Sequence, residues 1–127
     1  ILRYDGSLAR KIYAGADMFL MPSLIEPCGL GQMIAMRYGS VPIVRETGGL
    51  ADTVIDHTPE RGHGTGFVFS ELTPEACNDA LRRALETYQD KEMWRALQMR
   101  GMGCDFSWTA SAEEYVNLYH KAITLHE

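Results

Sequence analysis

The hydrophobic positions of this chain fall into short apolar runs separated by longer stretches with a helical period. The runs are apolar and partly β-branched, which predicts buried strands at 17–22, 41–44 and 67–69. Apolar positions three and four apart predict helices around them, at 7–15, 29–39, 73–88, 91–102 and 107–125. Strands that alternate with helices indicate parallel β-α units with right-handed crossovers.

Most of the predicted helices have an apolar face and a start or stop signal. Ser7 is the expected cap of the first helix, and Gly39 is expected to stop the second. Thr73 followed by Pro74 is a strong start for the third. We expect the inward faces to carry Leu30, Ile34 and Tyr38 in the second helix, Ala76, Cys77, Ala80, Leu81, Ala84, Leu85 and Tyr88 in the third, and Met93, Trp94 and Leu97 in the fourth.

Composition restricts the class of protein and of partner. The 127 residues are enough for one domain with a buried core. A net charge of −5 argues against a nucleic-acid partner, which would favour a clustered basic face. No apolar run approaches the roughly 20 residues that cross a bilayer, so no membrane span is expected.

The cysteines and histidines predict neither a disulfide framework nor a metal site. The three cysteines are widely spaced, with no Cys-x-x-Cys pair, which favours reduced thiols in a cytosolic protein. The four histidines have no familiar metal-ligand spacing, and we expect all of them at the surface. His57 begins a stretch rich in Gly and charge, 57–66, that is expected to be a mobile loop.

Two turns carry the candidate chemistry, and each follows a predicted strand. Glu26 precedes Gly29 and Gly31 after the first strand, and 47–50 follows the second. Because ligands of parallel sheets bind beyond the carboxyl ends of the strands, both turns should open onto one edge. Glycines let backbone N–H groups at a helix start approach a phosphate, and a nearby carboxylate can accept hydrogen bonds from sugar hydroxyls. A motif this short also fits an ordinary turn with an exposed acid.

The wider sequence resembles one known family. The segments that carry the resemblance are, in order, Glu26–Leu30 (EPCGL), Met36–Pro42 (MRYGSVP), Arg45–Val54 (RETGGLADTV), Gly66–Phe69 (GFVF) and Asp105–Trp108 (DFSW). Over nearly the whole chain the sequence is similar to the carboxyl-terminal part of bacterial glycogen synthases and plant starch synthases. That resemblance implies a retaining glycosyltransferase of family 5 with GT-B architecture, in which two Rossmann-like domains face each other across a cleft.

The resemblance also implies a fold class, a domain boundary and a reaction. The fold is α/β, a partial Rossmann-like parallel sheet with flanking helices, and residues 1–106 belong to the donor-binding domain. Residues 107–127 form a helix that crosses back to an N-terminal domain, which binds the glucan acceptor. The enzyme transfers glucose from ADP-glucose, or UDP-glucose in some relatives, to the non-reducing end of an α-1,4-glucan. It implies no cofactor and no metal.

The resemblance assigns site residues by the motif that each one matches. Glu26 is the implied catalytic residue, which orients the donor glucose and stabilises positive charge at its anomeric carbon. From the residues alone, Cys28 also fits a small buried residue and Tyr4 also fits a packing aromatic. In the family, the tyrosine that matches Tyr4 stacks on the adenine ring. The implied nucleotide-sugar contacts are Tyr4, Cys28, Gly29, Leu30 and Gly31.

One departure separates this family from its alternatives. Retaining transferases more broadly have two glutamates eight apart, but the position eight after Glu26 is Ile34, and starch and glycogen synthases also lack the second glutamate. Ile34 therefore argues against sucrose synthase or another nucleotide-sugar transferase. A non-catalytic module that binds nucleotide or glucan remains an alternative of a different class. For Arg37 and Arg45, pairing within the fold is preferred to phosphate contact.

The chain is expected to be part of a longer protein. It begins without Met, and the family's upstream basic residues and N-terminal domain are not in it, so alone it should have no synthase activity. The apolar face of the last helix, with Trp108, Tyr115 and Tyr119, should then be exposed or paired with a second copy. The resemblance implies the cytoplasm, in a bacterium, or a plastid, in a plant. The sequence leaves ADP-glucose against UDP-glucose undecided.

Overall fold

Three parallel strands form the sheet at the centre of the fold. The computed structural model describes residues 5–58 and 62–125. Its strands are β1 (Met18–Met21), β2 (Val41–Arg45) and β3 (Phe67–Phe69). They lie in the order β1-β2-β3, with Met18 opposite Val41 and Ile43 opposite Phe67. The parallel sheet and all three predicted strands are confirmed.

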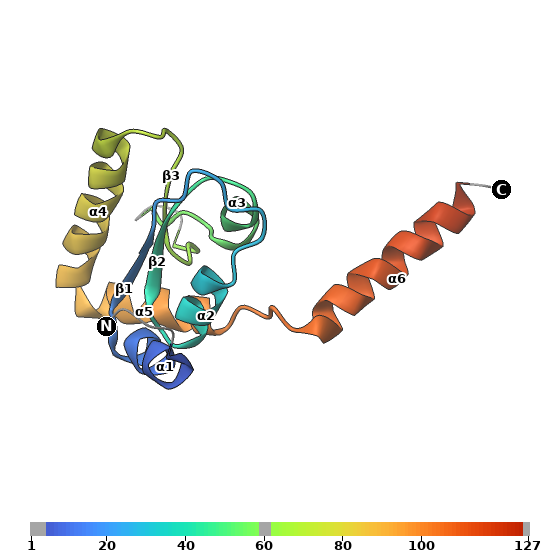
Figure 1. Ribbon diagram of the computed structural model, residues 1–127, viewed down its shortest axis with the longest axis horizontal. Helices are drawn as coiled ribbons and strands as arrows, with labels where there is room; N and C mark the ends of the chain where they lie inside the picture. Colours follow the sequence, from blue (N-terminus) through green and yellow to red (C-terminus); the bar gives the residue numbers. More distant parts are fainter. Residues whose placement is uncertain (1–4, 59–61, 126–127) are drawn as a thin grey trace.

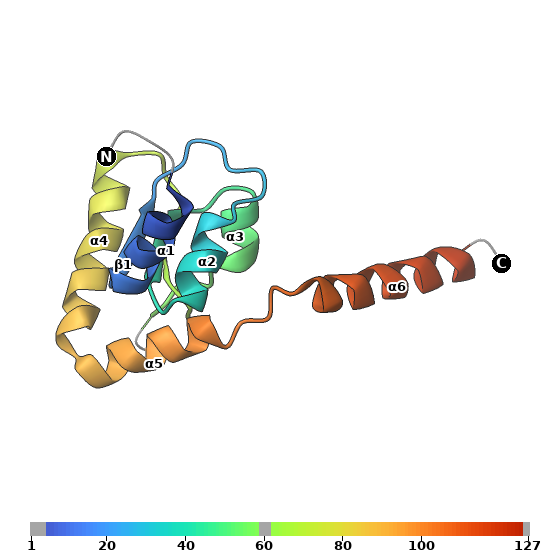
Figure 2. The ribbon, with the colours of Figure 1, turned by 60° about the horizontal axis from the view of Figure 1, so that its bottom comes forward.

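Helices cover both faces of this sheet. They are α1 (Gly6–Gly15), α2 (Gly31–Arg37), α3 (Gly49–Thr53), α4 (Pro74–Gln89), α5 (Lys91–Met102) and α6 (Trp108–Thr124). α2 and α3 lie on one side of the sheet and α4 on the other, while α6 projects away from the rest of the chain (Figures 1 and 2). α5 passes the ends where the strands begin, and Gln98 there donates to the Gly39 carbonyl at 2.6 Å. The predicted α/β class is therefore confirmed.

The central strand, β2, is buried on both faces and organises the core. Its residues Val41 and Ile43 pack with β3, α4 and α5, whereas Val44 packs with α2 and α3. Each of the three side chains is at most 1% exposed. A continuous apolar run is what a parallel strand needs when helices cover it on both sides.

α2 turns a different face to the sheet from the one that the sequence predicts. The residues that it buries are Gln32, Ala35 and Met36. The residues expected to face the sheet are exposed instead: Leu30 by 67%, Ile34 by 39% and Tyr38 by 41%. The helix lies close to β1, because a Cβ on Gly31 would be 3.2 Å from the Phe19 ring. The buried side chains are small or unbranched, and the β- and γ-branched Ile34 and Leu30 and the aromatic Tyr38 face outward.

The helix caps agree with the sequence at the later helices and differ at the first. Thr73 accepts a hydrogen bond from the Ala76 N–H at 3.2 Å, which confirms it as the cap of α4. In α1 the cap is Asp5 and not Ser7. The Asp5 carboxylate accepts from the N–H groups of Ser7 and Leu8, each at 3.0 Å. Ser7 lies inside the first turn, so its own N–H is one of the donors that a cap must satisfy.

His57 is buried, contrary to the expectation that all histidines lie at the surface. Its side chain is 3% exposed and meets the Phe67 ring edge-on, with 5.7 Å between the ring centroids. The His57 N–H donates to the Gly66 carbonyl at 2.8 Å. Of the stretch predicted as a mobile loop, His57 and residues 64–66 are buried, residues 62 and 63 are exposed, and 59–61 lie outside the described residues. The other histidines are exposed, at 63 and 120, or outside the described residues, at 126.

α6 buries none of its residues. Ser107 caps it by accepting a hydrogen bond from the Ala110 N–H at 3.3 Å. Tyr115, Tyr119 and Ile123 recur every four residues on one side, and they are 59%, 64% and 61% exposed. The predicted helix is confirmed, and its aromatic face is open. In the part of the chain that the structure describes, no helix is long and apolar enough to cross a membrane.

Replacing Leu97 with Ala should destabilise the chain by about 2–5 kcal/mol. Leu97 is fully buried in the main core cluster, so the smaller side chain leaves a cavity. Urea denaturation measures the free energy of unfolding. Leu85→Ala is the matched control. The sequence predicts Leu85 on the inward face of α4, but it is 54% exposed, so its loss should be about 0.5 kcal/mol or less. Equal losses in the two variants would contradict the assigned core.

Candidate functional site

The loop between β1 and α2, residues 22–30, lies at the edge where the strands end, and we call it the Glu26 loop. The Glu26 side chain is half-buried, and its carboxylate lies 3.5 Å from the Ser23 hydroxyl, a long hydrogen bond. Cys28 is exposed and Gly29 is buried. The site residues predicted at 26 and 28–31 are therefore contiguous at this edge. Tyr4 lies outside the described residues.

Arg45, the last residue of β2, fixes the first half of the Glu26 loop. Its Nε donates to the Ser23 carbonyl at 2.8 Å, and a terminal nitrogen donates to the Leu24 carbonyl at 2.5 Å. Because a guanidinium holds its donors in a rigid fork, the two carbonyls are fixed in direction as well as in distance. Arg37 donates to the Met102 carbonyl at 3.3 Å. Both arginines thus pair within the fold, the preferred interpretation of the sequence.

Gly48 and Gly49 support the middle of the Glu26 loop by direct backbone contact. The Gly49 N–H donates to the Glu26 carbonyl at 3.1 Å. A Cβ at Gly49 would overlap the Cys28 carbonyl, and one at Gly48 would overlap the Glu26 carbonyl. Gly48 also has φ 45° and ψ −133°, a conformation that residues with a side chain rarely adopt. The two turns predicted to share one edge of the sheet therefore touch each other.

The turn that leads into α2 depends on a glycine and a buried glutamine. Gly29 has φ 72°, and its carbonyl accepts a hydrogen bond from Gln32 Nε2 at 2.8 Å. The same nitrogen donates to Thr53 Oγ1, on α3, at 3.0 Å. Because α2 begins at Gly31, the first N–H groups of the helix have no partner within it. The loop thus offers a carboxylate as acceptor and backbone N–H groups as donors.

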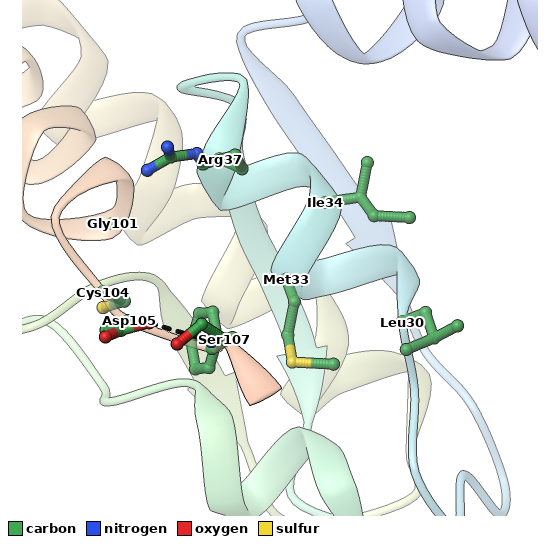
Figure 3. Close-up of a pocket in the computed structure, with 9 residues that line it drawn as sticks. Leu30, Met33, Ile34, Arg37, Gly101, Cys104, Asp105 and Ser107 are labelled. Carbon is green, nitrogen blue, oxygen red and sulfur yellow. Dashed lines mark hydrogen bonds between the residues drawn. The ribbon is translucent and has the colours of Figure 1, made fainter. Parts of the chain in front are cut away.

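An apolar groove of about 440 Å³ adjoins the loop, between α2 and the segment that follows α5 (Figure 3). Its two walls include Leu30, Met33 and Ile34 on one side and Cys104, Asp105 and Phe106 on the other. Burial raises the pKa of the Cys104 thiol. The Ser107 N–H donates to Asp105 at 2.8 Å and lowers the pKa of that carboxyl. Two of the α2 residues expected in the core thus line this groove.

The parts played by Gln32 and Thr53 are not evident from the sequence pattern. A polar residue at an inward position of a helix signals buried hydrogen-bond partners, but Gln32 lies off the face that the sequence predicts to be inward. The doubled glycine at 48–49 predicts a turn, but two successive glycines also allow two backbones to touch. Within residues 5–58 and 62–125, no three His, Cys, Asp or Glu side chains group as metal ligands.

Comparison with known proteins identifies the family. Residues 5–97 match the family model described as glycosyl transferases group 1. The chain belongs to this family. The matched range contains the Glu26 loop, the glycine pair and all three strands of the glycosyltransferase sheet.

Similar proteins of known name are glycogen synthases. The chain is 59% identical over 125 residues to the glycogen synthase of Syntrophotalea carbinolica, which covers 98% of this chain and 26% of that protein. It is 57% identical over 120 residues to the glycogen synthase of Geotalea uraniireducens, covering 94% and 25%. The chain therefore spans about a quarter of the length of these relatives.

Solved structures agree with the fold and with the family. The catalytic domain of starch synthase IV from Arabidopsis thaliana is 45% identical, with a TM-score of 0.86 over 98% of this chain and 26% of that chain. Sucrose-phosphate synthase from Thermosynechococcus elongatus is 27% identical, with a TM-score of 0.70 over 98% and 30%. The resemblance drawn from the sequence, to glycogen and starch synthases of GT-B architecture, is confirmed.

Gly49→Ala should displace the Glu26 loop and destabilise the chain. The added Cβ overlaps the Cys28 carbonyl, so either the loop or α3 must move. We expect a loss of about 1 kcal/mol or more in the free energy of unfolding, with large shifts in the amide NMR signals of residues 26–29. Gly15→Ala is the control, because a Cβ there meets nothing within 4 Å. Unmoved signals at 26–29 in Gly49→Ala would rule out the backbone contact.

Proposed function

We propose that this chain is the donor-side part of a glycogen or starch synthase that uses ADP-glucose. The reaction passes glucose from the nucleotide to the non-reducing end of an α-1,4-glucan, with retention at the anomeric carbon. The observation that carries the proposal is the position of Glu26, a half-buried carboxylate on a loop that Arg45, Gly49 and Gln32 hold at the carboxyl edge of the sheet. The high identity to glycogen synthases supports the same activity.

Glu26 is the proposed catalytic residue. As the bond between glucose and phosphate breaks, positive charge develops at the anomeric carbon, and a carboxylate aimed at that carbon stabilises it. The anchoring of the loop favours this role, because a carboxylate already in place needs no rearrangement during the reaction. Ser23 restricts the side chain further through its hydroxyl.

The proposed contacts for the donor are the backbone of the Glu26 loop and one upstream aromatic ring. Backbone N–H groups of the turn would donate to sugar hydroxyls and phosphate oxygens, at Cys28, Gly29, Leu30 and Gly31. Tyr4 would stack on the adenine. The choice of ADP-glucose draws support from the starch synthase IV structure, which is described as bound to ADP and acarbose.

Two other functions have less support. The sucrose-phosphate synthase structure is 27% identical to this chain, compared with 45% for starch synthase IV. Ile34 also stands where a second glutamate is found in the broader class. A non-catalytic module that binds nucleotide or glucan would have no need for a carboxylate on a loop whose backbone is held by so many contacts.

The rest of the active site is proposed to lie outside this chain. The family resemblance puts the pyrophosphate-binding basic residues upstream and the glucan acceptor on an N-terminal domain. We propose that α6 packs on that domain, because its aromatic face is exposed. A cytosolic enzyme, or a plastid enzyme in a plant, is part of the same proposal and draws support from the three free cysteines.

The proposed function can be tested in a grafted synthase. Here residues 5–125 of this chain replace the matching segment of the Syntrophotalea carbinolica glycogen synthase, to which the chain is 59% identical. We expect the grafted synthase to transfer labelled glucose from ADP-glucose to glycogen. Glu26→Gln should lower its kcat by about 10²–10³-fold, because the neutral amide cannot balance the developing charge.

Glu46→Gln is the matched control for that experiment. Glu46 is an exposed acid just beyond β2, and its carboxylate accepts a hydrogen bond from the Ser70 hydroxyl. This variant should keep kcat within about twofold of the unmodified graft, since surface substitutions have small effects. A folded graft without transfer, or a fully active Glu26→Gln variant, would refute the proposal. Robust transfer by the isolated chain would refute the division of the site between two parts.

The isolated chain should associate with itself through α6. Its aromatic face is open, with Tyr115 and Tyr119 at 59% and 64% exposed, and burying such a face is favourable. Sedimentation equilibrium should detect dimers or larger species at high concentration. Replacing both tyrosines with Glu should restore the monomer. A strictly monomeric profile of the unmodified chain at every concentration would argue against this association.

A further inference from the structure

A circuit of hydrogen bonds joins the Glu26 loop to α2 and α3. Gln32 Nε2 donates to the Gly29 carbonyl at 2.8 Å and to Thr53 Oγ1 at 3.0 Å. The Thr53 hydroxyl donates to the Gly49 carbonyl at 2.5 Å. The Gly49 N–H in turn donates to the Glu26 carbonyl at 3.1 Å. The two ends of the segment 26–29 are therefore connected to each other through two helices.

We infer that Gln32 is a positioning residue, which holds the loop that bears Glu26 against α3 through this circuit. The inference rests on the proposed function and extends it to a side chain in the core. Gln32 is 0% exposed, so its side chain acts through the backbone that it holds. A carboxylate misplaced by about 1 Å can lower a rate by about 100-fold, which is the scale on which such an anchor acts.

The geometry of the circuit requires a glutamine amide. The NH₂ group has two hydrogens, and its two short contacts are with acceptors on Gly29 and Thr53, while the Cys28 carbonyl lies farther away, at 3.5 Å. A reversed amide would place its oxygen against the Gly29 carbonyl oxygen, so only one orientation is favourable. The Gln32 amide also packs closely against Gly29, since a Cβ on Gly29 would lie 2.6 Å from Gln32 Oε1.

One atom of the Gln32 side chain is unfavourable for stability. Gln32 Oε1 is buried and has no hydrogen-bond partner among the described residues. A buried acceptor without a partner is unfavourable, and its neighbours on the inward face, Ala35 and Met36, are apolar. Methionine has a similar length and no unpaired acceptor. A residue that departs from the best core packing, beside a proposed catalytic loop, favours a role in the site.

A second glutamine in the chain provides a matched control. Gln98 Nε2 donates to the Gly39 carbonyl at 2.6 Å, and Gly39 has φ 80°. The contact is of the same kind, from a glutamine amide to the carbonyl of a glycine with positive φ. It lies at the opposite edge of the sheet, where β2 begins. Gln98→Met therefore removes an equivalent hydrogen bond without touching the circuit.

Hydrogen exchange in the 127-residue chain tests the circuit itself. Gln32→Met and Thr53→Val each remove the bond between these two residues and one further link, to Gly29 or to Gly49 respectively. Each should speed exchange of the Gly49 N–H by about tenfold or more. Gln98→Met should leave that rate unchanged. If the links act as one unit, the double variant should exchange no faster than the faster single variant. The proposed circuit would be refuted if both single variants leave the exchange rate of the Gly49 N–H unchanged. It would also be refuted if the rate increase in the double variant equals the product of the two single increases.

Kinetics in the grafted synthase test the effect on the site. Gln32→Met should lower kcat by about 10–100-fold and leave the KM for glycogen unchanged, because only the donor-side loop moves. Its thermal midpoint should stay within about 5 °C of that of Gln98→Met, which should keep full kcat. Gln32→Glu should recover activity relative to Gln32→Met as the pH falls, because a protonated carboxyl can donate to the Gly29 carbonyl.

The outcomes separate this inference from the function on which it rests. If the graft with the unmodified segment is active and Gln32→Met keeps full kcat, the positioning role is wrong and the proposed function stands. If Gln32→Met and Gln98→Met lose kcat equally, the effect is general loss of stability and the positioning role is again wrong. If the unmodified graft is inactive, the proposed function fails, and the exchange rate of Gly49 decides whether Gln32 holds the loop.

Discussion

Contact between two backbones is the constraint on which the site depends. The Glu26 loop lies so close to Gly48 and Gly49 that no side chain fits between them. Such a contact fixes the position of the loop backbone without depending on side-chain rotamers. Arg45 and Gln32 then act on a loop whose middle is already in place. Arg45 then holds the first half of the loop and Gln32 holds the turn at its end. The loop backbone that carries the Glu26 carboxylate is thereby positioned as firmly as the helices and strands around it.

The same close packing explains the groove beside the site. β2 is buried on both faces, and α2 approaches the sheet closely enough for Gly31 to lie against the Phe19 ring. The helix turns Gln32, Ala35 and Met36 toward the sheet, so Leu30 and Ile34, on its other side, face outward. The outward residues then form one wall of the apolar groove. Anchoring of the loop and exposure of an apolar surface next to it therefore have one cause.

The elements that the sequence predicts correctly are those fixed by local pattern or by the rules of parallel sheets. Buried strands read as short apolar runs, and the shared edge of Glu26 and Gly49 follows from strands that point the same way. The face of α2 could not be predicted, because the helix has apolar residues on two sides and the distance to β1 decides between them. The partners of Gln32 are equally hidden, since Thr53 is 21 residues away in sequence.

The charges near the Glu26 loop bear on which part of the proposed donor this edge of the sheet would bind. The chain carries a net charge of −5, and Glu26, the proposed catalytic residue of the loop, is itself an acid. Arg45, the cation that anchors the loop, directs two of its donors at loop carbonyls. A donor diphosphate placed beside Glu26 would be repelled unless cations from elsewhere neutralise it. Under the proposed function, the loop would therefore hold the sugar and share the phosphate oxygens with basic residues from another part of the protein.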